Sequence, residues 1–359
     1  MKYFVGWGAL LEQCFDDLCQ STGQRPDFIC DNNHEKQGRH LRGISCISLE
    51  SAKDDAEAEF FITVRKYHEL AAQIRSLGHH NIHIAHFDRT YHKLIRLTPY
   101  ETSSHMKTPF PMDFFHGKHV LITGASRGLG ALLASTLAKS GANLILHARE
   151  FSHLQDTIDR CKPHGQLVTA VSADLESPEA VKRLVHAINE TSSQVDVIYN
   201  NAAFFHPHSG SHYEIPASDF KTCFCINALA PILIANALIP DMLVRGFGRI
   251  INVSTALQHQ PNLGAYAVSK AALDKFVYDL APTLNGSGVA INLVDPGSLR
   301  TDMNPTGLYP ADSALNGLLL AALYDRTNGC WLSAQDYSGL SIDEAHAEMF
   351  RRFDQIHLS

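Results

Sequence analysis

Residues 119–141 read HVLITGASRGLGALLASTLAKSG. The apolar residues 119–122 predict a short buried strand, the glycines that follow predict a turn, and the periodic run from residue 129 predicts a helix. Gly124, Gly128 and Gly130 leave room for a tight turn and for a pyrophosphate to approach the helix N-terminus. This segment therefore predicts the start of a dinucleotide-binding α/β unit, although the same glycines could serve the turn alone.

Apolar strands alternate with amphipathic helices on both sides of this segment, which predicts α/β architecture with parallel sheets. Residues 98–117 interrupt the alternation with three prolines and small polar residues. We expect a small Rossmann-like N-terminal domain over 1–97, a linker over 98–117 and a catalytic domain over 118–359. The catalytic domain should contain a doubly wound Rossmann sheet of about seven parallel strands.

The N-terminal domain shows the same alternation in short form. Its Gly6-Trp7-Gly8 turn lacks the third glycine of the dinucleotide fingerprint, because Leu11 stands at that position. An acidic residue, Asp31, follows the second strand. We predict strands over Lys2–Val5, Asp27–Cys30, Glu59–Val64 and Ile82–His86, and helices over Leu10–Gln20 and Tyr67–Leu77.

The composition excludes several classes of protein. The 359 residues are 45% hydrophobic and 19% charged, as in soluble globular proteins. A formal net charge of -7 without clustered Lys and Arg disfavours nucleic acid as a partner. The apolar start ends at Glu12 and contains two glycines, so we expect a buried strand rather than a signal peptide, and we expect no membrane span. The eight cysteines form no CxxC pair, which favours reduced thiols in a cytoplasm.

Four histidines lie close together in the N-terminal domain, at positions 79, 80, 83 and 86. Strand alternation spreads their side chains over two faces, and no acidic ligand stands beside them. We therefore expect no metal site.

The sequence TGASRGLG at 123–130 resembles the cofactor motif of the short-chain dehydrogenases/reductases, and the similarity continues over about 200 residues. In VDVIYNNAA, residues 195–203, Asn200, Asn201 and Ala202 match the NNAG motif of that family, and Ala203 replaces its glycine. The resemblance implies an NAD(P)-dependent oxidoreductase. It also implies that Asp174 and Leu175 flank the adenine ring.

Two arginines bear on the choice of cofactor. The strand predicted over Asn143–Ala148 is followed by Arg149 rather than by an acid that would bind a ribose with two free hydroxyls. Arg149 and Arg127 offer guanidinium groups to a phosphate, with Ser126 as a further contact. In this family the pattern implies NADP(H).

Tyr266 and Lys270 lie four residues apart in GAYAVSKAALDKF, so a helix places them on one face. An ammonium beside a phenol lowers the pKa of the phenol by favouring the phenolate. By resemblance, Tyr266 exchanges a proton with the substrate oxygen, and Lys270 lowers its pKa and holds the nicotinamide ribose.

A hydroxyl group and an asparagine complete the implied catalytic site. A hydroxyl should come from INVST, where Thr255 takes the usual place of the family's serine and Ser254 precedes it; strand alternation allows one of the two to face the cofactor. Asn227 matches a helix asparagine of the family that holds a water, or it is a polar residue at a helix start.

The resemblance also implies a set of residues that contact the cofactor. These are Gly124, Ser126, Arg127, Gly128, Leu129, Gly130, Arg149, Asp174, Leu175, Asn200, Ala202, Tyr266, Lys270, Pro296, Gly297 and Thr301.

The substrate is less well defined. About the first 90 residues resemble the nucleotide-sugar-binding domain of bacterial sugar acyltransferases, which would place Asp31 near a ribose. Loops over 204–220 and 303–317 should rim the pocket, with His206, His208 and His212 as anion ligands or exposed loop residues.

These features predict an NADPH-dependent ketoreductase, acting on a sugar or nucleotide-sugar in bacterial surface-polysaccharide synthesis. The alternatives are a catalytically silent NADPH-binding sensor or scaffold, and a sugar-nucleotide epimerase or dehydratase. By family analogy we expect a homodimer or homotetramer.

Overall fold

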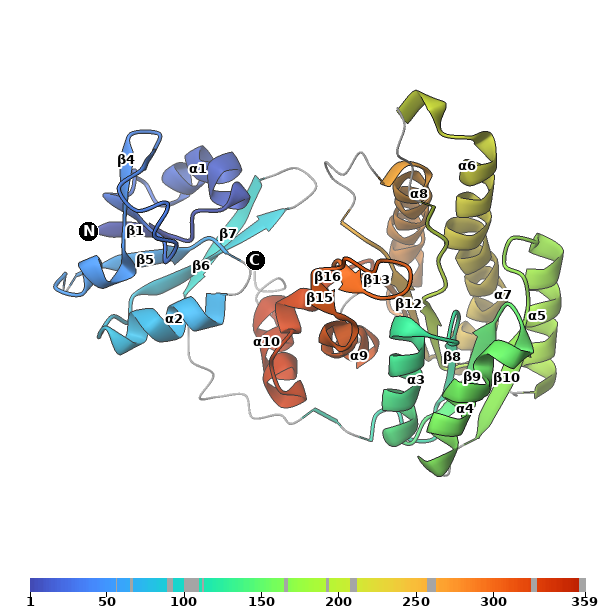
Figure 1. Ribbon diagram of the computed structural model, residues 1–359. Helices are drawn as coiled ribbons and strands as arrows, with labels where there is room; N and C mark the ends of the chain where they lie inside the picture. The colour runs from blue at the N-terminus through green and yellow to red at the C-terminus, as the bar shows by residue number, and fades with distance from the viewer. Residues whose placement is uncertain are drawn as a thin grey trace. The chain divides into compact units, whose positions relative to one another are not determined.

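The computed structural model describes residues 1–55, 57–64, 67–88, 93–99, 110–111, 113–164, 167–191, 194–206, 212–256, 263–323 and 328–354. The chain divides into two compact units, Met1–His105 and Met106–Ser359 (Figure 1).

The first unit contains a seven-stranded sheet in the order β3-β4-β2-β1-β5-β6-β7. Its strands are β1 (Lys2–Val5), β2 (Phe28–Cys30), β3 (His40–Leu41), β4 (Ile44–Ile47), β5 (Glu59–Ile62), β6 (Ile82–Asp88) and β7 (Lys93–Pro99). Its helices are α1 (Ala9–Ser21), the short 3-10 helix η1 (Leu49–Ala52) and α2 (Tyr67–Ser76).

Alternate residues of β1 explain why this strand lies at the centre of the sheet. Tyr3 and Val5 are buried in the cluster that contains residues of α2, and Phe4 is buried in the cluster that contains residues of α1. Because both faces are covered, the strand is apolar throughout.

The predicted elements of this unit agree with the structure to within two residues, but β3, β4 and β7 were not predicted. The expectation of purely parallel sheets is wrong at both edges, because β3 pairs antiparallel with β4 and β7 pairs antiparallel with β6. Both edge pairs join consecutive strands through short connections, which antiparallel pairing permits.

The second unit contains the predicted doubly wound sheet. Seven parallel strands follow the order β10-β9-β8-β11-β12-β13-β16. The order reverses between β8 and β11, and sheets of this kind bind ligands at the carboxyl ends of the strands at that point. The strands are β8 (His119–Ile122), β9 (Asn143–Ala148), β10 (Val168–Ser172), β11 (Val197–Asn200), β12 (Gly248–Val253), β13 (Val289–Asp295) and β16 (Trp331–Ser333), with a separate pair β14 (Leu299–Arg300) and β15 (Tyr309–Pro310).

Helices cover both faces of this sheet (Figure 1). One face packs against α3 (Gly128–Lys139), α4 (Gln155–Cys161), α9 (Leu315–Leu323) and α10 (Ile342–Asp354). The other packs against α5 (Pro178–Thr191), α7 (Ala230–Arg245) and α8 (Gly264–Leu280). The remaining elements are α6 (Ala217–Phe224), the π-helical turn η5 (Cys225–Leu229) and the 3-10 helices η2 (Phe151–Leu154), η3 (Lys162–His164), η4 (His212–Glu214), η7 (Ala281–Leu284), η8 (Ala311–Ala314) and η9 (Ala334–Tyr337).

One continuous helix, Ala217–Arg245, is long and apolar enough by length and composition to cross a membrane, where the sequence predicted no such run. Half of its most apolar window is buried, and Ile234, Leu238 and Met242 belong to the core of the second unit. A core helix of a soluble protein passes the same test, so this helix is weak support for a membrane span.

The core of the second unit begins before residue 118. Phe110 and Phe115 are buried in it, the Phe110 N–H donates to Asp343 Oδ1 at 2.7 Å, and the Phe110 ring meets the ring of His346 edge-on. We therefore propose that a catalytic fragment needs Phe110 for its full stability.

A fragment that begins at Met106 should fold and unfold cooperatively, because it retains these contacts. A fragment that begins at Asp113 should be less stable by about 3 kcal/mol, the size of removing a buried phenylalanine. Urea denaturation followed by circular dichroism measures both, with Phe110→Ala in the longer fragment as the matched control. An unfolded Met106 fragment would show that the second unit depends on the first.

Candidate active site

The glycine-rich turn leaves no room for side chains at two positions. A Cβ on Gly130 would lie 2.2 Å from the Gly124 carbonyl oxygen and 2.6 Å from Asn201 Nδ2. A Cβ on Gly124, whose φ is +66°, would lie 2.9 Å from the Ala202 Cα. The glycines are therefore required by close packing between the carboxyl ends of β8 and β11.

The same packing fixes the NNA segment. The Asn201 and Ala202 N–H groups each donate to Thr123 Oγ1 at 3.0 Å, and Asn201 Nδ2 donates to the Thr123 carbonyl at 2.9 Å. Helix α3 begins beside this contact, at Gly128, and the preceding residue Arg127 makes no side-chain capping bond. The first-turn amides of α3 are therefore open to an anion, which fits a cofactor pyrophosphate.

His147, near the end of β9, contacts the glycine-rich turn, and its role was not predicted from the sequence. The Gly124 N–H donates to His147 Nδ1 at 3.4 Å, and His147 Nε2 lies 3.1 Å from the Ala173 carbonyl oxygen. Burial lowers the pKa of His147 to about 4, so the ring is neutral near pH 7 and Nε2 carries the proton. A polar residue inside an apolar strand was the sequence feature that could have identified it.

The two predicted phosphate ligands are exposed at this edge of the sheet. Arg149 follows β9 and is exposed, and Arg127 is 71% exposed in its side chain. Arg127 Nη1 lies 3.6 Å from Asp302 Oδ2, an ion pair that the sequence analysis did not foresee. Because both partners are exposed, this pair contributes little to stability.

The segment after β13 returns to the glycine-rich turn. A Cβ on Gly128 would lie 3.7 Å from Thr301 Cγ2, so the Thr301 side chain lies over the start of α3. Gly297 has a φ of +80°, and its N–H donates to Asp295 Oδ1 at 2.9 Å. Gln335, which the sequence analysis missed, donates through Nε2 to the Pro296 carbonyl at 2.8 Å.

Tyr266 and Lys270 lie on one face of α8, as their spacing predicted. Lys270 is buried, its Nζ donates to the Val253 carbonyl at 2.6 Å, and Nζ lies 5.8 Å from the centre of the Tyr266 ring. Burial lowers the pKa of Lys270 to about 8. The Tyr266 ring packs edge-on against Phe205 at 5.3 Å between centres.

The pKa of Tyr266 differs from the expectation. Burial raises it above the ordinary value, and the charges of Asp295, Cys223 and Asp274 raise it further. The expected lowering by Lys270 is therefore not the net effect, because desolvation of the phenolate and acidic neighbours outweigh one ammonium whose charge is itself disfavoured by burial.

The two candidate hydroxyls have different surroundings. Ser254 is buried, and its Oγ donates to Asp274 Oδ1 at 2.6 Å. Thr255 is partly exposed and lies two residues beyond the end of β12. The Ser254 hydroxyl is thus directed to a buried carboxylate, which favours Thr255 as the hydroxyl that can meet a substrate.

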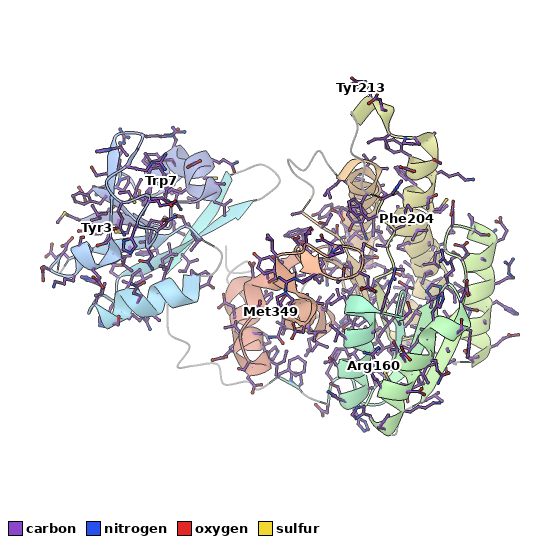
Figure 2. The ribbon with its side chains drawn as sticks, in the orientation of Figure 1. Tyr3, Trp7, Arg160, Phe204, Tyr213 and Met349 are labelled. Atoms are coloured by element: carbon purple, nitrogen blue, oxygen red, sulfur yellow. The ribbon has the colours of Figure 1, made fainter. Side chains whose placement is uncertain are left out.

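Asn227 lies inside a continuous helix rather than at a helix start. It belongs to the π-helical turn η5 between α6 and α7 and is fully buried. Its Oδ1 accepts from the Phe204 N–H at 2.7 Å, and its Nδ2 donates to the Phe204 carbonyl and to Ser269 Oγ at 2.9 Å each. Asn227 therefore ties α8 to the loop after β11, where Figure 2 labels Phe204. π-turns inside helices are frequent at functional sites.

The remaining predicted contacts lie at the same edge of the sheet. Asp174 follows β10 and is exposed, while the next residue, Leu175, is buried. Asn200 ends β11 and donates through Nδ2 to Asn252 Oδ1 at 2.9 Å. Ser126 is partly exposed, and Leu129 in the first turn of α3 is buried.

The predicted substrate loops are described in part. His206 Nδ1 lies 3.1 Å from Asp219 Oδ2, while His208 and the side chain of His212 lie outside the described residues. Tyr213, labelled in Figure 2, is 89% exposed. The carboxylate of Asp219 beside His206 makes this histidine a poorer ligand for an anionic substrate.

In the first unit, the Asp31 carboxylate already has hydrogen-bond and ion-pair partners within the protein. Asp31 Oδ2 accepts from the Trp7 N–H at 2.7 Å and lies 3.2 Å from Lys36 Nζ. The Trp7 indole N–H donates to Glu12 Oε1 at 2.7 Å, which places a second carboxylate in the first turn of α1. Carboxylates at this turn oppose binding of a phosphate there.

The histidines of the first unit have other partners. His79 Nε2 lies 3.0 Å from the Ala52 carbonyl oxygen, and the His83 ring stacks on Phe61. The side chain of His86 lies outside the described residues. Within the part of the chain that the structure describes, no group of three His, Cys, Asp or Glu residues could hold a metal ion.

The fold and the site define a dinucleotide-dependent oxidoreductase, and comparison with known proteins gives the family. The profile of the family described as short chain dehydrogenase matches residues 118–307, and the chain belongs to that family. Dehydrogenase/reductase SDR family member 4 of Bos taurus is 31% identical over 196 residues, which are 54% of this chain and 69% of that protein. Ketoacyl reductase HetN of Nostoc sp. is 32% identical over 188 residues, 52% of this chain and 65% of that protein.

Solved structures of similar fold agree with this family assignment. A metagenomic short-chain oxidoreductase in complex with NADP has a TM-score of 0.55 and 27% identity, over 60% of this chain and 96% of that one. Landomycin C-6 ketoreductase LanV, with bound NADP and rabelomycin, has a TM-score of 0.55 and 25% identity, over 62% of this chain and 96% of that one. The chain is therefore an oxidoreductase that acts on CH–OH or C=O groups.

Thr255→Val removes the hydroxyl while keeping the shape, and turnover of a ketone substrate should fall by about 10²-fold, the usual effect of one lost donor to an oxyanion. Ser254→Ala should instead lower the free energy of unfolding by about 1–3 kcal/mol, because Asp274 loses a buried hydrogen bond. Steady-state kinetics and urea unfolding on both variants give the comparison, and the reverse pattern would assign the substrate hydroxyl to Ser254.

Proposed function

We propose that the protein is an NADPH-dependent ketoreductase. The observation that supports the proposal is that the glycine-rich turn follows β8 and that Lys270, which shares a helix face with Tyr266, donates to the Val253 carbonyl at the end of β12, in a sheet with the order β8-β11-β12. When bound, the cofactor supplies a hydride to the carbonyl carbon.

The residues of the chain then have to bind the cofactor and deliver a proton. The open amides of α3 would hold the pyrophosphate, while Thr301 and the Pro296–Gly297 turn would hold the carboxamide. Thr255 and Tyr266 hold the carbonyl oxygen, and Tyr266 Oη gives up its proton as the alkoxide forms. Lys270 stabilises the resulting phenolate. A raised pKa of Tyr266 suits this direction, because it keeps the phenol protonated before reduction.

The choice of NADPH over NADH rests on Arg127 and Arg149. Both side chains are exposed beside the turn, and no acid follows β9 at position 149. A ribose 2′-phosphate would accept charge-assisted bonds from both guanidinium groups, and it would compete with Asp302 for Arg127.

The substrate class rests on the first unit. Its resemblance to a nucleotide-sugar-binding domain supports a sugar or nucleotide-sugar substrate in bacterial surface-polysaccharide synthesis. Since Asp31 is bonded to Trp7, a ligand there would have to contact other groups of the unit. Docking of a partner is the second role that this unit could serve.

The assembly and location are part of the same proposal. Exposed apolar side chains on α7 and α8, among them Val244 and Tyr278, favour a homodimer or homotetramer. The eight cysteines without a CxxC pair favour the cytoplasm.

NADPH should bind more tightly than NADH, and Arg127→Ala with Arg149→Ala should remove most of the difference. Each lost charge-assisted bond is worth about 1.5–3 kcal/mol, so NADPH affinity should fall by more than about tenfold for each substitution. Asp302→Asn is the matched control and should preserve or improve NADPH affinity, because it frees Arg127. Calorimetry with both cofactors tests this, and equal affinities in the unmodified protein would refute the assignment.

Tyr266→Phe removes the proton donor and keeps the ring, so turnover should fall by about 10²–10⁴-fold with NADPH affinity nearly unchanged. A panel of keto-sugars and simple ketones, followed by NADPH oxidation, provides the assay. Near-normal turnover would exclude this site, and failure of every ketone would favour the sensor or scaffold alternative.

A further inference from the structure

Asp274 continues the row of catalytic side chains along α8. Tyr266, Lys270 and Asp274 follow one another at intervals of four residues, so they lie on one face of the helix. Asp274 is 9% exposed, and its Oδ1 accepts the Ser254 hydroxyl proton at 2.6 Å.

A buried carboxylate needs a compensating charge or several donors, because desolvation of an ion in a protein interior costs several kcal/mol. Asp274 accepts its hydrogen bond from one neutral hydroxyl, that of Ser254. The ionisable groups that act on the Lys270–Asp274 pair are Tyr266 from α8, Cys223 from α6 and Asp295 from β13. Lys270 is the cation of this set.

The electrostatics of the two groups are reciprocal. Burial raises the pKa of Asp274 to about 6, while the bond from Ser254 and the charge of Lys270 oppose that rise. Burial lowers the pKa of Lys270 to about 8, while the charge of Asp274 opposes that fall. Both groups are therefore charged in the window between about pH 6 and about pH 8.

We propose that Asp274 is a positioning residue of the reductase site, whose carboxylate, oriented by Ser254, is the buried counter-charge that keeps Lys270 protonated. This inference rests on the proposed function, because it concerns the lysine that holds the nicotinamide ribose and stabilises the Tyr266 phenolate.

The sign of the pH effect follows directly. The working form of Lys270 is protonated, so its function is lost as the pH rises through its pKa. Removal of the negative charge of Asp274 lowers that pKa further. The alkaline loss of cofactor affinity and of turnover should therefore move to lower pH, whereas a purely structural role would lower both at every pH without moving the midpoint.

The test is Asp274→Asn, which keeps the side-chain shape and an acceptor for Ser254 but removes the charge. NADPH affinity is measured by calorimetry across the alkaline range, and kcat/KM is measured with a ketone that the wild type reduces. Both alkaline midpoints should shift down by about one pH unit, the size expected for loss of a nearby opposite charge. An unmoved midpoint in a variant that melts like the wild type would overturn the proposal.

Two controls separate charge from packing. Asp274→Glu retains the charge and should keep the midpoint near the wild-type value even where it lowers the rate. Ser254→Ala removes the hydrogen bond but not the charge, so it should lower the free energy of unfolding without moving the midpoint. If Asp274→Asn fails to fold, Asp274→Ser replaces it in the same titration and is judged by the same shift.

The outcome is distinct from failure of the proposed function. If Tyr266→Phe retains turnover, the assigned chemistry is wrong whatever Asp274 does. If Tyr266→Phe abolishes turnover and the Asp274→Asn midpoint stays in place, the chemistry stands and the role given to Asp274 is wrong.

Discussion

Close packing between the carboxyl ends of β8 and β11 is the constraint on which the site depends. The Gly124 carbonyl and the Asn201 amide approach the first turn of α3 so closely that a methyl at Gly130 would collide with both, and a methyl at Gly124 would collide with the Ala202 backbone. This contact brings the NNA segment beside the glycine-rich turn, next to the start of α3, where the N-cap residue Arg127 makes no side-chain capping bond. It is the local geometry that lets a parallel sheet present backbone donors to a phosphate.

Around this contact the protein places several ionisable groups where water is excluded. His147 is neutral under the turn, Lys270 loses basicity through burial, and Tyr266 and Asp274 become weaker acids. Desolvation is the largest cause of each shift; the charges of neighbours oppose the shift of Lys270 and add to the shift of Tyr266. The reactive groups therefore act as a coupled set, and the pKa of any one of them depends on the protonation of the others.

The first unit shows how a similar topology can be closed to the same ligand. Its β1–α1 turn also carries glycines, but Trp7 occupies the turn, and the carboxylates of Asp31 and Glu12 take the Trp7 donors. A helix N-terminus that faces its own carboxylates does not attract a phosphate. Similar strand–turn–helix patterns thus leave helix amides free of a side-chain cap in the second unit, whereas carboxylates occupy the turn in the first unit.

The sequence by itself determined the family, the Rossmann sheet of the second unit and the shared face of Tyr266 and Lys270. These features follow from local rules: hydrophobic period, glycine spacing and the i, i+4 geometry of a helix. It did not reveal the antiparallel edges of the first sheet, the Arg127–Asp302 pair, the π-helical turn at Asn227 or the bond from Ser254 to Asp274. Each of these depends on residues distant in the chain or on how a helix is packed, as do the pKa values of Tyr266 and Lys270. Burial and neighbouring charge are properties of the folded chain, so only the tertiary structure decided which hydroxyl is engaged by a carboxylate and in which direction each catalytic group is shifted.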